Sequence, residues 1–167
     1  SICFSERFFV PACEVAAKLV QAGAIGRVIQ TVGLGPHRLN RAIRPDWFFD
    51  KAAFGGILAD LASHQIDQFL FYTGETDAQI TAANVANRAF MDDPDFDDFG
   101  EILLQGKGAS AYVRVDWFTP DGLPTWGDGR LFLLGTLGTI ELRKYVDVAG
   151  RPGTDHLLLS TMEGVRY

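Results

Sequence analysis

Three side chains that could do acid–base chemistry recur in one short segment of the sequence. Asp60, His64 and Asp67 stand four and three residues apart, and at about 100° per residue they would share one stripe of a helix. A histidine titrates near neutral pH, and a carboxylate one turn away can orient its ring and stabilise its cation. Such a pair suits removal of a proton from an alcohol while a hydride leaves for a cofactor.

The surroundings of this stripe help to distinguish a reactive site from an ordinary solvated helix face. A half-polar helix is normally solvated on its polar face. Here, however, no Lys, Arg or Glu occurs between Lys51 and Glu75, although these residue types are favoured on helix surfaces. Two consecutive glycines before Ile57 also let a ligand or another backbone approach the helix start closely. Asp60 and His64 are therefore candidate catalytic residues.

A metal ion shared by Asp60, His64 and His37 would be another use of the same residues, as in a metal-dependent hydrolase or isomerase. His and Asp at helical spacing can share an ion. No third ligand, however, stands at a fixed spacing from the helical pair. The sequence therefore predicts no metal site.

The elements that must position these residues follow from the hydrophobic pattern. Helices are expected over 11–22, where proline suits the first turn, and over 57–72, which Gly74 ends. Period-two alternation predicts strands over 28–34, 79–90, 99–105, 109–118, 130–134, 139–145 and 156–161. This order predicts an α+β domain, with an open, mostly antiparallel sheet and helices packed on one face. The other face would expose a large apolar patch, and a partner subunit is the simplest cover, so we expect a homo-oligomer.

Composition limits the class of protein further. The 167 residues, 47% of them hydrophobic, suffice for one packed domain. A net charge of −6 without a basic cluster argues against nucleic acid and anionic membranes as partners. No apolar run approaches the ~20 residues of a membrane span, and the opening residues do not resemble a signal peptide. Cys3 and Cys13 form no CxxC motif, which favours a reducing cytoplasm over a zinc site or a disulfide scaffold.

The sequence opens without Met, on a short apolar run at positions 2–4. Such a run is typical of a strand or linker entered midway. We therefore expect the chain to be the tail of a longer gene product.

The motif around His64 resembles the C-terminal domain of the Gfo/Idh/MocA family (glucose–fructose oxidoreductase, inositol dehydrogenase and relatives). Members carry a helix of the form GG-x-x-x-D-x-x-x-H-x-x-D, which is matched here from 55 to 67. An Arg-plus-aromatic entry at 5–8, a helix that ends at 22–28 and a late GT-x-G hairpin at 134–141 are also similar to the family. The resemblance covers essentially the whole chain, 1–167, and implies an open sheet like those of the C-terminal domains of dihydrodipicolinate reductase and GAPDH.

The resemblance also implies roles for particular residues. It makes His64 the acid–base group at a substrate hydroxyl, with Asp60 as its partner. Candidates for the substrate pocket are Arg7, His37, Arg38, Trp47, Asp67 and Trp126. Among these, Asp67 could instead cap a helix or pair with an arginine, and the tryptophans could pack in the core or an interface as readily as stack on a sugar.

The family's NAD(P)-binding Rossmann domain and its EKP motif, which carries a catalytic lysine, belong to an N-terminal half that this sequence lacks. The segment from Gly33 to Arg38 opens like a dinucleotide loop but ends in Arg and leads into no helix, so it predicts no cofactor site. The resemblance thus implies the substrate-side domain of an NAD(P)-dependent oxidoreductase acting on a sugar, polyol or related hydroxy compound, inactive on its own. The alternative is a non-catalytic dimerisation or sugar-sensing module whose parent has lost the chemistry.

Overall fold

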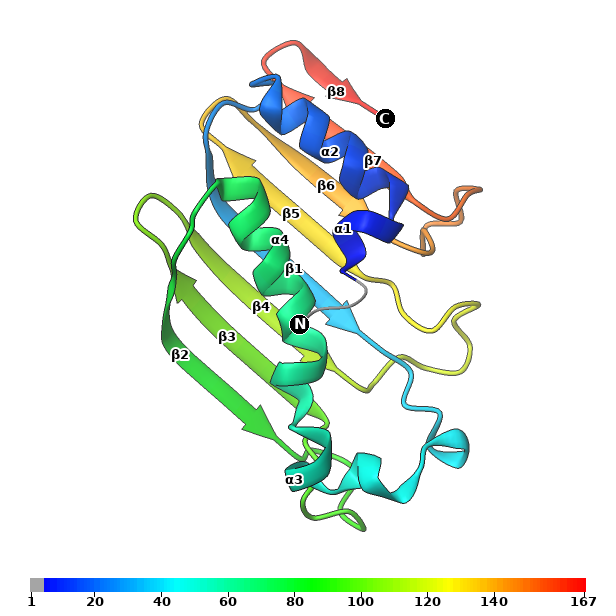
Figure 1. Cartoon of the computed structure of the whole chain (residues 1–167). Coiled ribbons are helices and arrows are strands. Elements are labelled where there is room, and N and C mark those ends of the chain that lie inside the picture. Colours follow the sequence, from blue (N-terminus) through cyan, green and yellow to red (C-terminus); the bar gives the residue numbers. More distant parts are fainter. Residues whose placement is uncertain (1–4) are drawn as a thin grey trace.

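The computed structural model describes residues 5–167 as one sheet with helices on one of its faces (Figure 1). The predictions that fall on residues 1–4, including the one for Cys3, lie outside the described residues. The helices and helical turns are α1 (Glu6–Phe9), α2 (Pro11–Gln21), η1 (Arg41–Ile43), η2 (Asp46–Phe49), α3 (Lys51–Phe54), η3 (Leu58–Ala62) and α4 (Ser63–Thr73). The strands are β1 (Val28–Pro36), β2 (Gln79–Ala86), β3 (Phe99–Gln105), β4 (Ser110–Asp116), β5 (Arg130–Gly135), β6 (Gly138–Arg143), β7 (His156–Thr161) and β8 (Gly164–Arg166).

The strands follow the order β2-β3-β4-β1-β5-β6-β7-β8 across the sheet. β1 pairs in parallel with β4, and the other neighbouring strands pair antiparallel. The predicted α+β class, with an open and mostly antiparallel sheet, is therefore confirmed. Because β1 and β4 are parallel, their carboxyl ends meet at one edge of the sheet, where His37 and Trp117 follow them.

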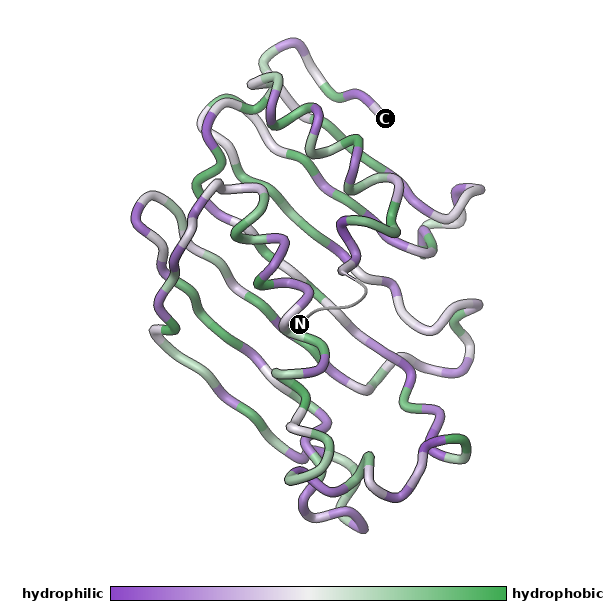
Figure 2. The backbone as a smooth tube through the Cα atoms, in the orientation of Figure 1, coloured by the Kyte–Doolittle hydropathy of each residue, from purple (hydrophilic) through white to green (hydrophobic). Residues whose placement is uncertain are grey.

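Two hydrophobic cores lie between the helices and the sheet. One joins η3 and α4 to β3 and β4, and the other joins α2 to β5, β6 and β7. Figure 2 shows the hydropathy changing along the strands as successive residues alternate between the two faces. In β4, for example, Val113 and Val115 are buried whereas Tyr112 and Arg114 are half-buried. Burial of one face fixes the strand register, because a slip by one residue would expose the apolar set.

The structure changes several predicted boundaries. The helix expected over 57–72 begins with η3, a π-helical turn, after two glycines whose φ values are 87° and 85°. The strand expected over 139–145 ends at Arg143, and Tyr145 beyond it has a left-handed φ of 73°. The sequence did not predict α1, α3 or β8, because elements of three or four residues are too short to show a period.

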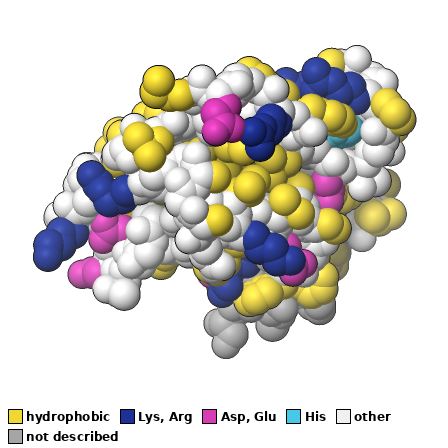
Figure 3. Space-filling view, turned by 90° about the horizontal axis from the view of Figure 1, so that it is seen from above, with side chains coloured by type: hydrophobic (Ala, Val, Ile, Leu, Met, Phe, Trp, Pro, Cys, Tyr) yellow, Lys and Arg dark blue, Asp and Glu magenta, His cyan; other side chains and the backbone are white. Residues whose placement is uncertain are grey.

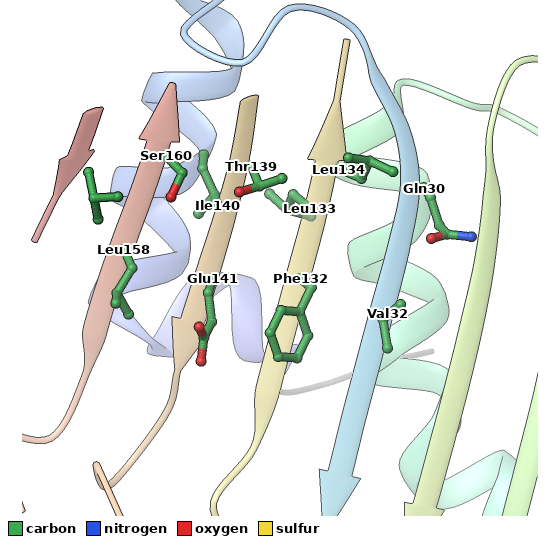
Figure 4. A pocket seen from close by; sticks show the side chains of 11 residues that line it. Gln30, Val32, Phe132, Leu133, Leu134, Thr139, Ile140, Glu141, Leu158 and Ser160 are labelled. Atoms are coloured by element: carbon green, nitrogen blue, oxygen red, sulfur yellow. The ribbon is translucent and has the colours of Figure 1, made fainter. Parts of the chain in front are cut away.

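No described helix covers the other face of the sheet, and this open face carries apolar side chains. Figure 4 shows Phe132, Glu141 and Leu158 on this side, with the helices behind the strands. They line a hollow of about 240 Å³ to which β1, β5, β6, β7 and β8 contribute residues. Phe132 is 37% exposed and Leu134 is 41% exposed.

Charged side chains are dispersed over the surface that is visible from above. In Figure 3, Lys and Arg lie interspersed with Asp and Glu among hydrophobic side chains. Some of the chain's exposed charges are paired along one element, such as Lys18 with Glu14 at 3.1 Å. Within residues 5–167 no helix combines the length and the apolar character that crossing a membrane requires.

Candidate active site

His64 lies in the first turn of α4, directly after the π turn η3. Turns of this kind occur frequently at functional sites. The residue is half-buried, and its Nδ1 is buried without a hydrogen-bond partner in the described part of the chain. Its backbone carbonyl accepts a hydrogen bond from Gln68 Nε2 at 3.0 Å. The fold thus holds the backbone of His64 while leaving an imidazole nitrogen unpaired.

Asp60 lies within η3, one turn before His64, but no hydrogen bond joins the two side chains in the described structure. The segment 58–62 is π-helical, so the regular 100° spacing assumed from the sequence does not apply across it. Desolvation raises the pKa of Asp60, while the nearby charges of Arg44 and His64 oppose that rise. The structure therefore brings Asp60 and His64 into electrostatic contact without a direct bond.

Arg7 and Asp67 form an ion pair that ties α1 to α4. Arg7 Nε donates to Asp67 Oδ2 at 2.7 Å, and Ser5 Oγ donates to the same oxygen. The Arg7 guanidinium also lies over the rings of Phe8 and Phe71, at 4.1 and 4.8 Å from their centroids. Asp67 thus pairs with an arginine, which is one of the two roles that the sequence left open.

The rings of His37, Trp126 and Tyr145 form an aromatic cluster in which neighbouring rings are tilted against each other. The ring centroids of His37 and Trp126 are 4.2 Å apart, and those of Trp126 and Tyr145 are 4.4 Å apart. His37 Nδ1 is 3.2 Å from the carbonyl oxygen of Gly35. Since a carbonyl only accepts, Nδ1 carries the proton and Nε2 keeps a lone pair.

Burial lowers the pKa of His37 to about 4, although the Gly35 carbonyl and the Glu6 charge act in the opposite direction. His37 is therefore neutral at physiological pH. The charge of His64 also acts on His37, which places the two imidazoles in one electrostatic environment. A neutral His37 can accept a hydrogen bond from a ligand hydroxyl through Nε2.

The side chains of two other candidates for the pocket have different neighbours. Trp47 is 56% exposed, and its ring centroid lies 6.1 Å from that of Phe48. The Arg38 guanidinium donates to the carbonyls of Pro120 and Leu123, at 2.9 and 2.5 Å, and so holds the loop after β4. The Arg38 backbone N–H, however, donates to the Trp126 carbonyl at 2.6 Å, so the structure brings His37, Trp126 and the Arg38 backbone together.

A buried polar cluster beside His64 escaped the sequence analysis. Glu6 is 8% exposed and Lys144 is fully buried, and the two form an ion pair. Gln65 and Gln68, both buried, donate to the same Glu6 oxygen at 3.2 and 2.7 Å. The period of β6 contained a signal for Lys144, because it follows the buried Ile140 and Leu142 at the same alternation.

Neither a metal site nor a dinucleotide loop emerges from these residues. The described residues include no group of three or more His, Cys, Asp or Glu side chains placed to hold a metal ion. Gly33 and Gly35 lie in β1 beneath the Gln65 side chain, where an added Cβ on Gly33 would come within 2.6 Å of Gln65 Oε1. These glycines make room for Gln65 and form no phosphate-binding turn.

The open sheet and its helix-borne histidine define an α+β domain with a candidate acid–base site. Residues 14–141 match the family model of the GFO/IDH/MocA C-terminal domain. The chain belongs to this family of oxidoreductase domains. A comparison with curated proteins found no match.

Several solved structures share the fold along almost the whole chain. A protein from Erwinia carotovora atroseptica SCRI1043, assigned as an oxidoreductase, is 51% identical with a TM-score of 0.94, over 98% of this chain and 49% of its own. Aldose-aldose oxidoreductase from Caulobacter crescentus, complexed with glycerol, is 22% identical with a TM-score of 0.69, over 98% and 45%. Levoglucosan dehydrogenase, in complex with NADH and levoglucosan, is 22% identical with a TM-score of 0.67, over 93% and 43%. The chain thus spans about half the length of these proteins.

Proposed function

We propose that this chain forms the substrate side of an NAD(P)-dependent oxidoreductase that acts on a sugar, a polyol or a related hydroxy compound. The observation that carries the proposal is the position of His64, half-buried and unpaired at Nδ1, among Asp60, Glu6 and His37. Family membership supports an oxidoreductase reaction, and the ligands in the names of two similar structures, glycerol and levoglucosan, support a polyhydroxylated substrate.

In this proposal, oxidation removes a proton and a hydride from one carbinol group of the substrate. His64 takes the hydroxyl proton, and the C–H bond breaks as the carbonyl forms. The nicotinamide, when bound, accepts the hydride. A negative charge nearby stabilises the imidazolium that His64 becomes, and Asp60 is one group that can supply it.

The remaining residues of the site would orient the substrate. His37 Nε2 would accept a hydrogen bond from a second hydroxyl, because His37 is neutral. The Trp126 ring, 38% exposed, offers an apolar face on which a sugar ring can stack. Arg7 and Asp67 would fix the position of α1 against α4 through their ion pair.

The dinucleotide would be held mainly outside this chain. The chain covers about half the length of its structural relatives. Within the described residues, the Gln65 side chain packs against Gly33 and Gly35, the one G-x-G pair that lies in a strand, and so fills the space beside them. We place the cofactor, NAD or NADP, on an N-terminal Rossmann domain and expect the chain alone to be inactive. The free, buried thiol of Cys13 fits a reducing compartment, and we place the protein in the cytoplasm.

The open face of the sheet would form the interface of a homodimer. It carries the hollow lined by β1 and β5–β8 and exposed apolar residues such as Phe132 and Leu134. A self-complementary, partly apolar face is the kind of surface that a twofold dimer buries.

A screen of the full-length protein tests the catalytic proposal. Reduction of NAD+ or NADP+, followed by absorbance, should occur with at least one member of a panel of sugars and polyols. His64→Ala should lower kcat by about 10²-fold or more, since general acid–base groups contribute that much. His156→Gln is the matched control, because this histidine lies in β7 and bonds to Tyr167. Turnover that survives in His64→Ala would remove the catalytic role, and sugar binding without any turnover would favour a sensing module.

A further inference from the structure

The carboxylate of Glu6 receives hydrogen bonds from two other parts of the fold. Gln65 and Gln68 of α4 donate to Oε2, at 3.2 and 2.7 Å. Lys144, which directly follows β6, donates to the same oxygen. Tyr145 donates its hydroxyl to Oε1 at 3.1 Å. Glu6 thus links α1, α4 and the connection after β6 at a single buried point.

The buried ion pair of Glu6 and Lys144 is not needed for stability alone. An ion pair as buried as Glu6 and Lys144 loses the hydration of both charges, and apolar residues of similar size often stabilise a fold equally well. Burial raises the pKa of Glu6, but the charge and hydrogen bond of Lys144, with the hydrogen bond of Gln68, outweigh it and bring the pKa to about 2. Glu6 is therefore ionised throughout the physiological range.

The cluster is also adjacent to His64. Gln65 follows His64 in the sequence, and Gln68 Nε2 bonds both to Glu6 and to the His64 carbonyl. The charges of Glu6 and His64 act on each other. The charge of His64 acts on Glu6 and on Asp60; Glu6 is held in its ionised form, whereas desolvation raises the pKa of Asp60.

We propose that Glu6 is a positioning residue for His64: its bonds to Gln65 and Gln68 fix the backbone that carries the ring, and its negative charge, paired with Lys144, acts on the imidazole. The inference rests on the proposed function for its catalytic meaning. The effect on the His64 ring itself does not depend on turnover and can be measured without it.

Other charged groups surround His64, and the effect of Glu6 must be separated from theirs. The charged and titratable groups nearby are Asp60 of η3, Asp67 of α4 with its partner Arg7 of α1, His37 and Arg44 after β1, and Lys144 and Tyr145 after β6. Glu6→Gln leaves all of these in place and removes one negative charge at nearly constant shape.

The test is an NMR comparison of the full-length protein labelled with ¹³C-histidine, at one fixed pH. The His64 ring signal is assigned by its loss in His64→Gln. In Glu6→Gln, this signal should move to a new chemical shift, because the charge that acts on the ring and the bonds that hold its backbone are changed. If the protein turns over, kcat should also fall about tenfold with KM nearly unchanged, because substrate contacts are retained.

Glu6→Gln leaves the Lys144 ammonium buried without its partner and could fail to fold. The double variant Glu6→Gln/Lys144→Met removes both charges, and the His64 signal should again move from its wild-type chemical shift. Asp98→Asn is the matched control, because Asp98 is a fully buried carboxylate that accepts hydrogen bonds from the backbone of Arg88 and Ala89. It should lower thermal stability and leave the His64 signal at its wild-type position.

The outcomes separate this inference from the proposed function. An unchanged His64 signal in a folded Glu6 variant would overturn the inference, whether or not the wild-type protein is an active dehydrogenase. A displaced signal in a protein that turns over no hydroxy compound would support the coupling of Glu6 to His64 and reject the proposed function.

Discussion

His37 is a histidine whose environment keeps it neutral in the folded protein. It lies between Trp117 and Trp126, with ring centroids at 5.6 and 4.2 Å, and donates from Nδ1 to the Gly35 carbonyl. Burial is the largest cause that lowers its pKa, to about 4 from an ordinary value of 6.5. Protonation would place a cation among these aromatic rings, where the charge of His64 opposes it.

This shift makes stability depend on pH. Between pH 6.5 and 4 the unfolded chain binds a proton at His37 that the folded protein does not, so the free energy of unfolding should fall as the pH is lowered through this window. Above the window, His37 contributes no such dependence. His37→Gln should remove it, so urea titrations at several pH values should show a variant less sensitive to this range than the wild type. Parallel curves for the two proteins would contradict the buried, neutral state of His37.

The sequence pattern identifies the candidate acid–base residues, but it does not identify the buried residues that surround them. The spacing of Asp60 and His64 was visible because acid–base residues stood where surface Lys and Glu were expected. Glu6 and Lys144 were not recognised, because their role depends on contact between segments 138 residues apart. No local pattern reports such a contact, and Tyr145 was missed for the same reason.

Among the secondary-structure elements, the packing of α4 on β1 determines the position of His64. Gln65 lies directly over Gly33 and Gly35, and the absence of side chains there lets the helix approach the strand closely. The same Gln65 side chain donates to Glu6. The two glycines, whose spacing resembles a nucleotide-binding loop, thus allow the close approach of the helix that carries His64.

Gly33→Ala should therefore destabilise the protein and displace α4. The new Cβ would lie 2.6 Å from Gln65 Oε1 and 3.1 Å from Gln65 Cβ, and overpacking of this kind costs about 1–3 kcal/mol. Guanidinium unfolding should show this loss. Gly122→Ala is the control, because no heavy atom lies within 4 Å of its added Cβ and its φ is ordinary. Equal stability of the two variants would show that α4 does not depend on the close approach.

Most elements are predictable because they are long enough to show a regular hydrophobic period. Two strands, β3 and β7, have the predicted bounds. The π turn η3 was not predictable, because hydrophobic periodicity does not distinguish it from the start of an α-helix. Because of this turn, the 100° spacing does not relate Asp60 to His64; their charges interact, but no hydrogen bond joins their side chains in the described residues.

Within residues 5–167, helices cover one face of the sheet and leave the other face open, and the proposed dimer would bury this open face. Phe132→Lys, in the middle of the open face, should shift the protein toward the monomer, because a buried unpaired charge opposes association. Light scattering after size-exclusion chromatography measures the mass. Met162→Lys is the control, since Met162 is 96% exposed in the turn between β7 and β8. A monomeric wild-type protein would contradict the proposed interface.

In the proposed function, the hydroxyl group to be oxidised binds at His64, on the helix-covered side of the sheet. A crystal structure of the full-length protein with a nicotinamide cofactor and its sugar or polyol substrate measures this directly. We expect a substrate oxygen within hydrogen-bond reach of the His64 ring, about 2.6–3.2 Å, with the sugar beside His37 and Trp126. A substrate bound on the open face, or beyond reach of the imidazole, would contradict it.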